Sequence, residues 1–192
     1  MATTLVIGGM GVDAGIEFAQ QLQGVDVIRL DVPHPCRVQY LNGTGINPAY
    51  SIANAIRSVG SPFTAWVMAC NTAHAVYDDV CDLLPGGLAA MGVNMVENTI
   101  DAVGSLNPMW LGTTVLIHST GIIRQGSIRL PNDVDQEIIQ AAIWAAKVGQ
   151  YSFSHEIARI VGDNVVVAGC TEMPAILRSA GIMHYVDPVS LL

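Results

Sequence analysis

Basic residues are scarce in this chain, which has seven arginines and one lysine, Lys147, against 16 acidic residues. The formal net charge is −8, and the basic residues form no run or cluster in the sequence. Because binding to a nucleic-acid backbone depends on many Lys and Arg contacts, we expect no nucleic-acid partner. An anionic ligand would have to be held by a few cations focused in a pocket, which makes Lys147 a candidate binding residue.

Long apolar runs are also lacking. No segment reaches the roughly 18 uninterrupted apolar residues that a membrane-spanning helix needs. The N-terminal stretch "MATTLVIGGMGVDAG" has no positively charged region, and glycines interrupt its apolar residues, so it does not have the pattern of a signal peptide. We therefore expect a cytoplasmic protein with no membrane partner.

Cysteine pairs with the spacing of a redox or metal motif are absent. The four cysteines, Cys36, Cys70, Cys81 and Cys170, form no CxxC motif, and in a cytoplasmic protein they are expected to be free thiols. A reactive pair that forms a disulfide stays open as an alternative. A zinc site would have to start from Cys70 and His74, four residues apart, and the sequence supplies no second cluster of ligands for it.

What the chain does contain is an alternation of short β-branched runs with longer helical patterns. Apolar residues make up 51% of the sequence and charged residues only 12%, so a sizeable core can form. We predict strands at residues 3–9, 25–31, 63–69, 87–93, 113–119, 164–170 and 184–188, and helices at about 13–23, 47–59, 71–84, 95–106, 133–149, 154–162 and 173–181.

Strands joined by crossover helices form parallel sheets that are covered on both faces. The predicted fold class is α/β, with two similar three-layer units related by pseudo-two-fold symmetry, each a parallel sheet flanked by helices. Residues 1–95 are expected to form the first unit, with 181–192 as a segment that could complete it, and residues 96–180 the second. Ligands of such sheets bind at the carboxyl ends of the strands, so we expect the active site in the cleft between the units.

The first predicted strand ends in the glycine-rich stretch "GGMGVDAG". Its third glycine comes one position too late for a dinucleotide-binding motif, and Asp31 is the single acidic candidate at the end of the next strand. A turn that lets a small anionic ligand approach backbone amides is the favoured interpretation.

Cysteines follow two predicted strands in similar settings, in "WVMACNTAH" and "VVVAGCTEMP". A single cysteine at a strand end is most often a small buried hydrophobic residue. Here Cys70 precedes Asn-Thr and Cys170 precedes Thr-Glu, each just before a helix, where backbone amides stabilise a thiolate and can bind a carboxylate. Two such thiols facing each other across a cleft could take a proton from one face of a carbon and return one to the other.

The motifs "VMACNTAH" and "VAGCTEMP" resemble the two signature motifs of the aspartate/glutamate racemase superfamily, and most of all those of its aspartate racemase branch. "LVIGGMG" is similar to that branch's opening turn, and "HPCRVQYL" to its Pro-Asp-Arg-Thr segment. The similarity continues in "MGVNMVENTIDAV", "STGIIRQG", "LPNDVDQ" and "AKVG", and so spans nearly the whole chain. Glu172 favours the aspartate-type branch, because glutamate racemases typically carry histidine after the second Cys-Thr.

The resemblance implies a racemase that acts on aspartate or a close acidic amino acid without pyridoxal phosphate, metal or any other cofactor. Cys70 and Cys170 would be its two catalytic acid/base residues, Cys70 for the D-enantiomer and Cys170 for the L-enantiomer. The implied substrate-binding residues are Asn71, Thr72 and Thr171 for the α-carboxylate, Arg37 and Lys147 for the side-chain carboxylate, Glu172 beside the second thiol, and Met10 on the pocket floor. Lys147 also lies near a predicted helix end, where a cation compensates the helix dipole.

Some positions depart from the family pattern. Cys36 stands where the family usually has aspartate before the arginine, and His118 and Ile122 replace small and hydroxylated residues. The changes at His118 and Ile122 keep open a catalytically weak relative that only binds an acidic ligand. Glutamate, hydantoin and broad-specificity racemases are further alternatives, whereas single-cysteine decarboxylases fit less well because both cysteines are present. We expect a homodimer, in which a partner subunit covers apolar sheet surface.

Overall fold

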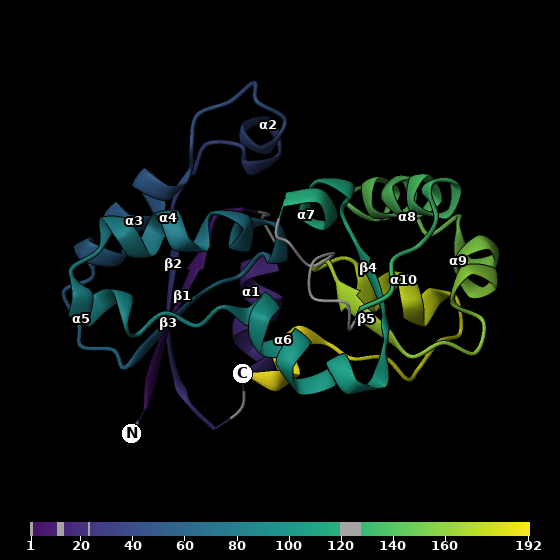
Figure 1. The fold of residues 1–192 in the computed structure, drawn as a ribbon. Coiled ribbons are helices and arrows are strands. Elements are labelled where there is room, and N and C mark those ends of the chain that lie inside the picture. The colour runs from purple at the N-terminus through teal and green to yellow at the C-terminus, as the bar shows by residue number, and fades with distance from the viewer. Residues whose placement is uncertain (1, 11–13, 23, 120–127) are drawn as a thin grey trace. The chain divides into compact units, whose positions relative to one another are not determined.

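A computed structural model describes residues 2–10, 14–22, 24–119 and 128–192 (Figure 1). The chain divides into two compact units, residues 1–98 together with Leu192, and residues 99–191. Helix α6 (Met95–Val103) carries the boundary between them.

The first unit contains a parallel three-stranded sheet with the strand order β2-β1-β3. Because crossover connections are right-handed and the strand order reverses at β1, helices α1 and α3 cover opposite faces of this sheet. The elements of the unit are β1 (Thr3–Gly8), α1 (Ala14–Gln21), β2 (Asp26–Asp31), α2 (Arg37–Leu41), α3 (Ala49–Ser58), β3 (Ala65–Met68), the 3-10 helix η1 (Asn71–Val76), α4 (Tyr77–Leu83) and α5 (Gly86–Ala89).

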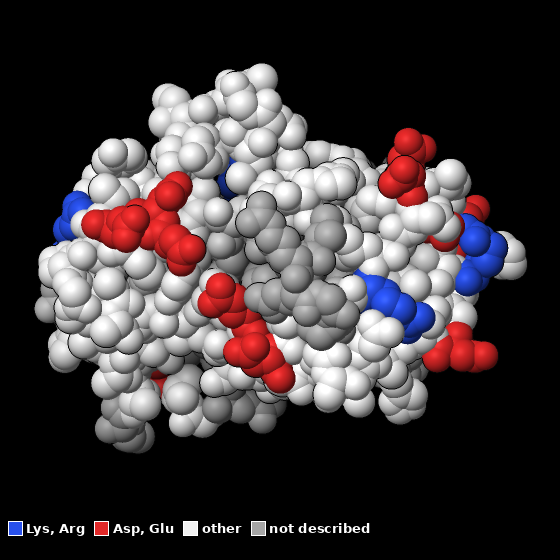
Figure 2. Space-filling model, in the orientation of Figure 1, with Lys and Arg blue, Asp and Glu red and all other residues white. Residues whose placement is uncertain are grey.

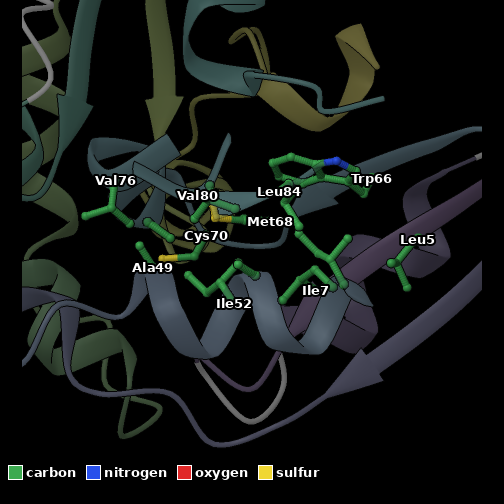
Figure 3. Packing of buried hydrophobic residues seen from close by; sticks show 13 residues of the cluster. Leu5, Ile7, Ala49, Ile52, Trp66, Met68, Cys70, Val76, Val80 and Leu84 are labelled. Carbon is green, nitrogen blue, oxygen red and sulfur yellow. The ribbon is translucent and has the colours of Figure 1, made fainter. Parts of the chain in front are cut away.

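Alternate residues of β1 and β3 form one core of this unit. Leu5 and Ile7 of β1 and Trp66 and Met68 of β3 are fully buried and belong to one hydrophobic cluster with the apolar face of α3. The side-chain period of a strand is two residues, so these four point to the same face of the sheet. In Figure 3, Leu5 and Trp66 lie toward one end of the cluster and Cys70 toward the other, so the core extends to the carboxyl ends of the strands.

The strand predicted at 87–93 is wrong. Residues Gly86–Ala89 form the short helix α5, whose first turn is closed by hydrogen bonds from Leu88 N and Ala89 N to the carbonyl of Pro85. Only Gly92 pairs with the sheet, through a single parallel bridge to Trp66. The Trp66 indole donates to the Leu88 carbonyl at 2.7 Å, so the tryptophan holds this segment by its ring as well as by its backbone.

The second unit contains the parallel strands β4 and β5. Parallel bridges add Arg129 beside β4 and Val186 beside β5, so the order across this sheet is 129, β4, β5, 186. The first unit has the same order, with β2, β1, β3 and then Gly92. The elements of the second unit are η2 (Gly104–Leu106), β4 (Met109–Gly112), α7 (Thr114–Ser119), α8 (Asp133–Ala146), α9 (Ser154–Val161), β5 (Val166–Gly169), α10 (Met173–Ser179) and η4 (Pro188–Leu191).

The strand predicted at 113–119 is also wrong, because the strand lies just before it and residues 114–119 form α7. Buried Trp110 and Leu111 pair in register with Val167 and Ala168 of β5. Thr113 then starts the helix, since its hydroxyl accepts a hydrogen bond from Leu116 N at 3.4 Å. The β-branched residues around Thr113 are typical of a strand, but this cap and the pairing of β4 decide the local structure.

The last segment of the chain belongs to the second unit up to Leu191. The Val186 backbone bridges that of β5, with Ala168 N donating to the Val186 carbonyl at 2.8 Å. This pairing extends the second sheet by one position beside β5. Within the described part of the chain, no helix is both long enough and apolar enough to cross a membrane.

Candidate active site

Cys70 follows β3 and Cys170 follows β5, the strand that takes the place of β3 in the order of the second sheet. They are 6% and 7% exposed. The chain order across each sheet reverses at β1 or β4, so the carboxyl ends of β1 and β3, and of β4 and β5, flank the place where open parallel sheets bind ligands. The cysteines therefore occupy equivalent places in two sheets of the same order.

The two cysteines also share a backbone turn. The Cys70 carbonyl accepts from Ala73 N at 3.0 Å, and the Cys170 carbonyl accepts from Met173 N at 2.9 Å. After Cys70 the chain continues as the 3-10 helix η1, and α4 begins only at Tyr77, so the single helix predicted from residue 71 is divided in two. This tight turn keeps each cysteine at the start of a helical segment.

Polar residues next to Cys70 are buried with it. Asn71 and Thr72 are each 4% exposed. The Asn71 Oδ1 atom is buried and has no hydrogen-bond partner among the residues that the structure describes. A buried amide oxygen without a partner is costly, so it is a candidate acceptor for the donor group of a ligand.

His74 supports the turn at Cys70. Its Nδ1 lies 3.0 Å from the Cys70 carbonyl, so this nitrogen must carry the proton and donate it. Burial lowers the pKa of His74 from 6.5 to about 4, and the ring is therefore neutral at physiological pH. Its ring also stacks on Tyr77, with centroids 6.2 Å apart. No group of three or more His, Cys, Asp and Glu side chains that could hold a metal ion occurs among the described residues.

Cys170 belongs to a connected set of polar groups in the second unit. Its Sγ donates to Glu172 Oε2 at 2.8 Å, and the Thr171 hydroxyl donates to the same oxygen at 3.0 Å. Lys147 Nζ lies 3.8 Å from the other carboxylate oxygen, Oε1. The proton on the second thiol is therefore held by a carboxylate that has a cation beside it.

Met10 and Arg37 lie in the first unit near the carboxyl end of its sheet. Met10 follows β1 and packs against the cluster that contains Cys70. Arg37 is the first residue of α2, which contacts η1, the helix that starts after Cys70. Cys36, the residue before it, is exposed. All four cysteines are free thiols.

Several residues of this region were missed by the sequence reasoning. His34 Nδ1 lies 2.7 Å from the Ser51 hydroxyl, and burial lowers the pKa of His34, with Gly8 and Arg37 among its neighbours. The sequence offered one sign that His34 could lie near the site: it stands three residues before Arg37, in the segment between two predicted elements.

In the second unit, buried Thr113 follows β4 as Gly9 follows β1. Gln136 of α8 donates to the Gly112 carbonyl at 2.9 Å and to the Thr114 hydroxyl at 3.2 Å, so it holds this strand end. Thr113 was missed because it fell inside the strand predicted at 113–119, and the predicted helix at 133–149 gave no sign of the contacts of Gln136. His118 is exposed on α7, and Ile122 lies outside the described residues.

Charged side chains do not form a broad basic area on the face drawn in Figure 2. The acidic residues described there lie in separate groups, and the basic ones are few.

No protein-family model matches the chain. Its structure is similar to that of a proposed Asp/Glu racemase from Yersinia pestis, with a TM-score of 0.70 and 18% sequence identity over 100% of this chain and 95% of that one. It is also similar to glutamate racemase from Francisella tularensis, solved in complex with D-glutamate, with a TM-score of 0.60 and 17% identity over 99% of this chain and 76% of that one. The resemblance to the aspartate/glutamate racemase superfamily is thus confirmed as a similarity of fold over the full chain.

Proposed function

We propose that the protein is a cofactor-independent amino-acid racemase that interconverts L- and D-aspartate, or a close acidic amino acid, by two-base proton transfer at Cα. One observation carries the proposal. Two buried thiols, Cys70 and Cys170, follow equivalent strands of two units with the same strand order, each in the same turn. The similarity of fold to Asp/Glu racemases supports this chemistry.

In the proposed reaction one thiol acts on each face of the substrate Cα. When the D-enantiomer binds, the Cys70 thiolate removes the α-proton and becomes a thiol. The Cys170 thiol gives its proton to the opposite face of the carbanion and becomes a thiolate. The L-enantiomer reacts in the reverse sense, and each turnover leaves the protein in the form that accepts the other enantiomer.

Without a cofactor that withdraws electrons, the carbanion must be stabilised by cations and hydrogen-bond donors at the carboxylates. We assign Asn71, Thr72 and Thr171 to the α-carboxylate, through side chains and backbone amides. Arg37 and Lys147 would hold the side-chain carboxylate. Met10 would line the pocket, which fits its packing against the cluster that contains Cys70.

Glu172 influences which of the two thiols carries a proton before the substrate binds. Its Oε2 accepts a hydrogen bond from Cys170 Sγ at 2.8 Å, which favours the form in which Cys170 is the acid and Cys70 the base. That form reacts with the D-enantiomer. The two enantiomers have equal free energies in solution, so the equilibrium constant is one and kcat/KM must be the same for both. A preference for one protonation form can therefore make kcat and KM differ between the enantiomers, but not their ratio.

Isotope exchange tests the proposal directly. L- and D-aspartate are incubated separately with the protein in D₂O, and Cα deuteration is followed by NMR together with optical rotation. We expect both enantiomers to exchange and to lose optical activity. Cys70→Ser and Cys170→Ser should each abolish racemisation, whereas Cys81→Ser, which removes a free thiol outside the proposed site, should not.

If the wild-type protein binds both enantiomers of aspartate and glutamate but exchanges neither, it is a binding protein and the racemase proposal fails. If Cys70→Ser racemises at the wild-type rate, the two-thiol mechanism fails. Glutamate is the second candidate substrate, because the structurally similar Francisella tularensis enzyme was solved with D-glutamate. Parallel exchange experiments with both amino acids rank the two.

A further inference from the structure

The last turn of α8 presents an exposed tryptophan next to the sole lysine of the chain. Trp144 and Lys147 are three residues apart, so their side chains lie on the same side of a helix. Lys147 Nζ lies 4.7 Å from the centroid of the Trp144 ring, within the range of a cation–π contact. Trp144 is 54% exposed, whereas Trp66 and Trp110 are fully buried. The core therefore does not account for this tryptophan.

Lys147 lies at the C-terminal end of α8. Gly149 adopts a left-handed backbone with φ of 74°, and Gly149 N and Gln150 N close the helix on the carbonyls of Ala146 and Ala145. A cation at this end compensates the helix dipole in whichever direction its side chain points. The dipole therefore does not explain why the ammonium lies over an indole ring on one side and near Glu172 on the other.

The carboxylate of Glu172 links this lysine to the second thiol. Its Oε2 accepts from Cys170 Sγ at 2.8 Å, and its Oε1 lies 3.8 Å from Lys147 Nζ. A carboxylate next to a thiol opposes formation of the thiolate, and a cation beside that carboxylate offsets the effect. The side chains of Lys147 and Glu172 are 32% and 21% exposed, so solvent screens this pair only in part.

We propose that Trp144 is a positioning residue of the site: its ring holds the Lys147 ammonium against Glu172 and thereby favours the thiolate form of Cys170. This inference takes from the proposed function only that Cys170 is the reacting thiol. It adds a residue outside the two cysteine motifs, and it gives Lys147 a partner within the protein besides a substrate carboxylate.

The test measures how fast each cysteine is alkylated by iodoacetamide as a function of pH, by mass spectrometry of the peptides. The rate follows the thiolate fraction, so a lost cation moves the Cys170 profile to higher pH. A change in access to the thiol would instead scale the rate by the same factor at every pH. Cys70 in the same sample serves as the internal control.

Three substitutions probe the contact. Lys147→Met removes the charge and keeps the length, Trp144→Leu removes the ring, and Trp144→Phe keeps a smaller ring. An exposed cation–π contact changes an equilibrium by about two- to fivefold. We therefore expect Trp144→Leu to lower the neutral-pH alkylation rate of Cys170 by about that factor, Lys147→Met by at least as much, and Trp144→Phe by less. Tyr151→Leu, which removes an exposed aromatic residue after α8, should leave the profile unchanged.

A double-mutant cycle separates positioning from packing. If Trp144 acts through Lys147, then Trp144→Leu has no further effect on the Cys170 profile in a Lys147→Met background. An equal effect in both backgrounds, or an unshifted profile in Lys147→Met alone, overturns the inference. The readout does not need turnover, so a protein that shows these shifts but fails to racemise refutes the proposed function and leaves this inference standing.

Discussion

Acid should destabilise the first unit through one buried histidine. Burial lowers the pKa of His74 from 6.5 to about 4. As the pH falls below 6.5 the unfolded chain takes up a proton that the folded protein refuses until about pH 4, so acidification favours unfolding. The stability that depends on neutral His74 is complete above the upper value and is lost progressively as the pH falls through this window.

The size of the effect follows from the width of the window. Each pH unit within it changes the free energy of unfolding by about 1.4 kcal/mol. Moving from pH 7 to pH 5 should therefore lower the free energy of unfolding by about 2 kcal/mol through His74 alone. Other titrating groups add their own contributions, so the prediction is made for the difference between the wild type and a variant without this titration.

His74→Asn is the matched variant, because an asparagine amide can still donate to the Cys70 carbonyl but does not titrate. Urea unfolding at pH 7 and pH 5, followed by tryptophan fluorescence and circular dichroism, gives the free energies. The decrease in the free energy of unfolding from pH 7 to pH 5 should be about 2 kcal/mol smaller in His74→Asn than in the wild type. His155→Asn replaces an exposed histidine of α9 and serves as the control. Equal losses in wild type and His74→Asn would refute the argument.

Three further outcomes are expected. Gly169→Ala should lower the free energy of unfolding by about 1–3 kcal/mol, because the added Cβ would lie 1.9 Å from Nε1 of buried Trp110. Gly60→Ala is the control and should be nearly neutral, because its added Cβ would meet nothing within 4 Å. Equal urea midpoints for the two variants would contradict this. Asn132→Ala should cost about 1 kcal/mol, since its Oδ1 caps α8 by accepting from Asp135 N at 2.9 Å, and an unchanged midpoint would count against the cap. Light scattering should give the mass of a homodimer, and a monomer at all concentrations would exclude it.

Much of the fold follows from local patterns in the sequence. β1, β3 and β5 are short apolar runs that are buried on both faces of parallel sheets, and α8 is a long run with an Asn-capped start, so each is recognisable without its neighbours. Residues 87–93 and 113–119 have equally suggestive compositions but form other structures. Their conformation depends on contacts from elsewhere in the chain, such as the Trp66 indole on the Leu88 carbonyl and the pairing of β4 with β5.

The candidate site divides in the same way. Cys70 and Cys170 were found because each stands at a strand-to-helix junction, which a few neighbouring residues define. The contacts of Trp144 and His34 were not predicted, because a single tryptophan or histidine in the sequence gives no sign of the residues that it will contact. The Lys147–Glu172 contact joins residues far apart in the sequence, and no local pattern predicts such a pair.

The sequence by itself determined the α/β class, the repeated cysteine turn and the two thiols, because strand and helix periodicity and the residues around a junction are local properties. Only the tertiary structure decided the strand order shared by the two units, the burial that keeps His74 neutral, and the link from Trp144 through Lys147 and Glu172 to Cys170. Burial and charge interactions depend on distances in space, and those distances are set by packing between segments that lie far apart along the chain.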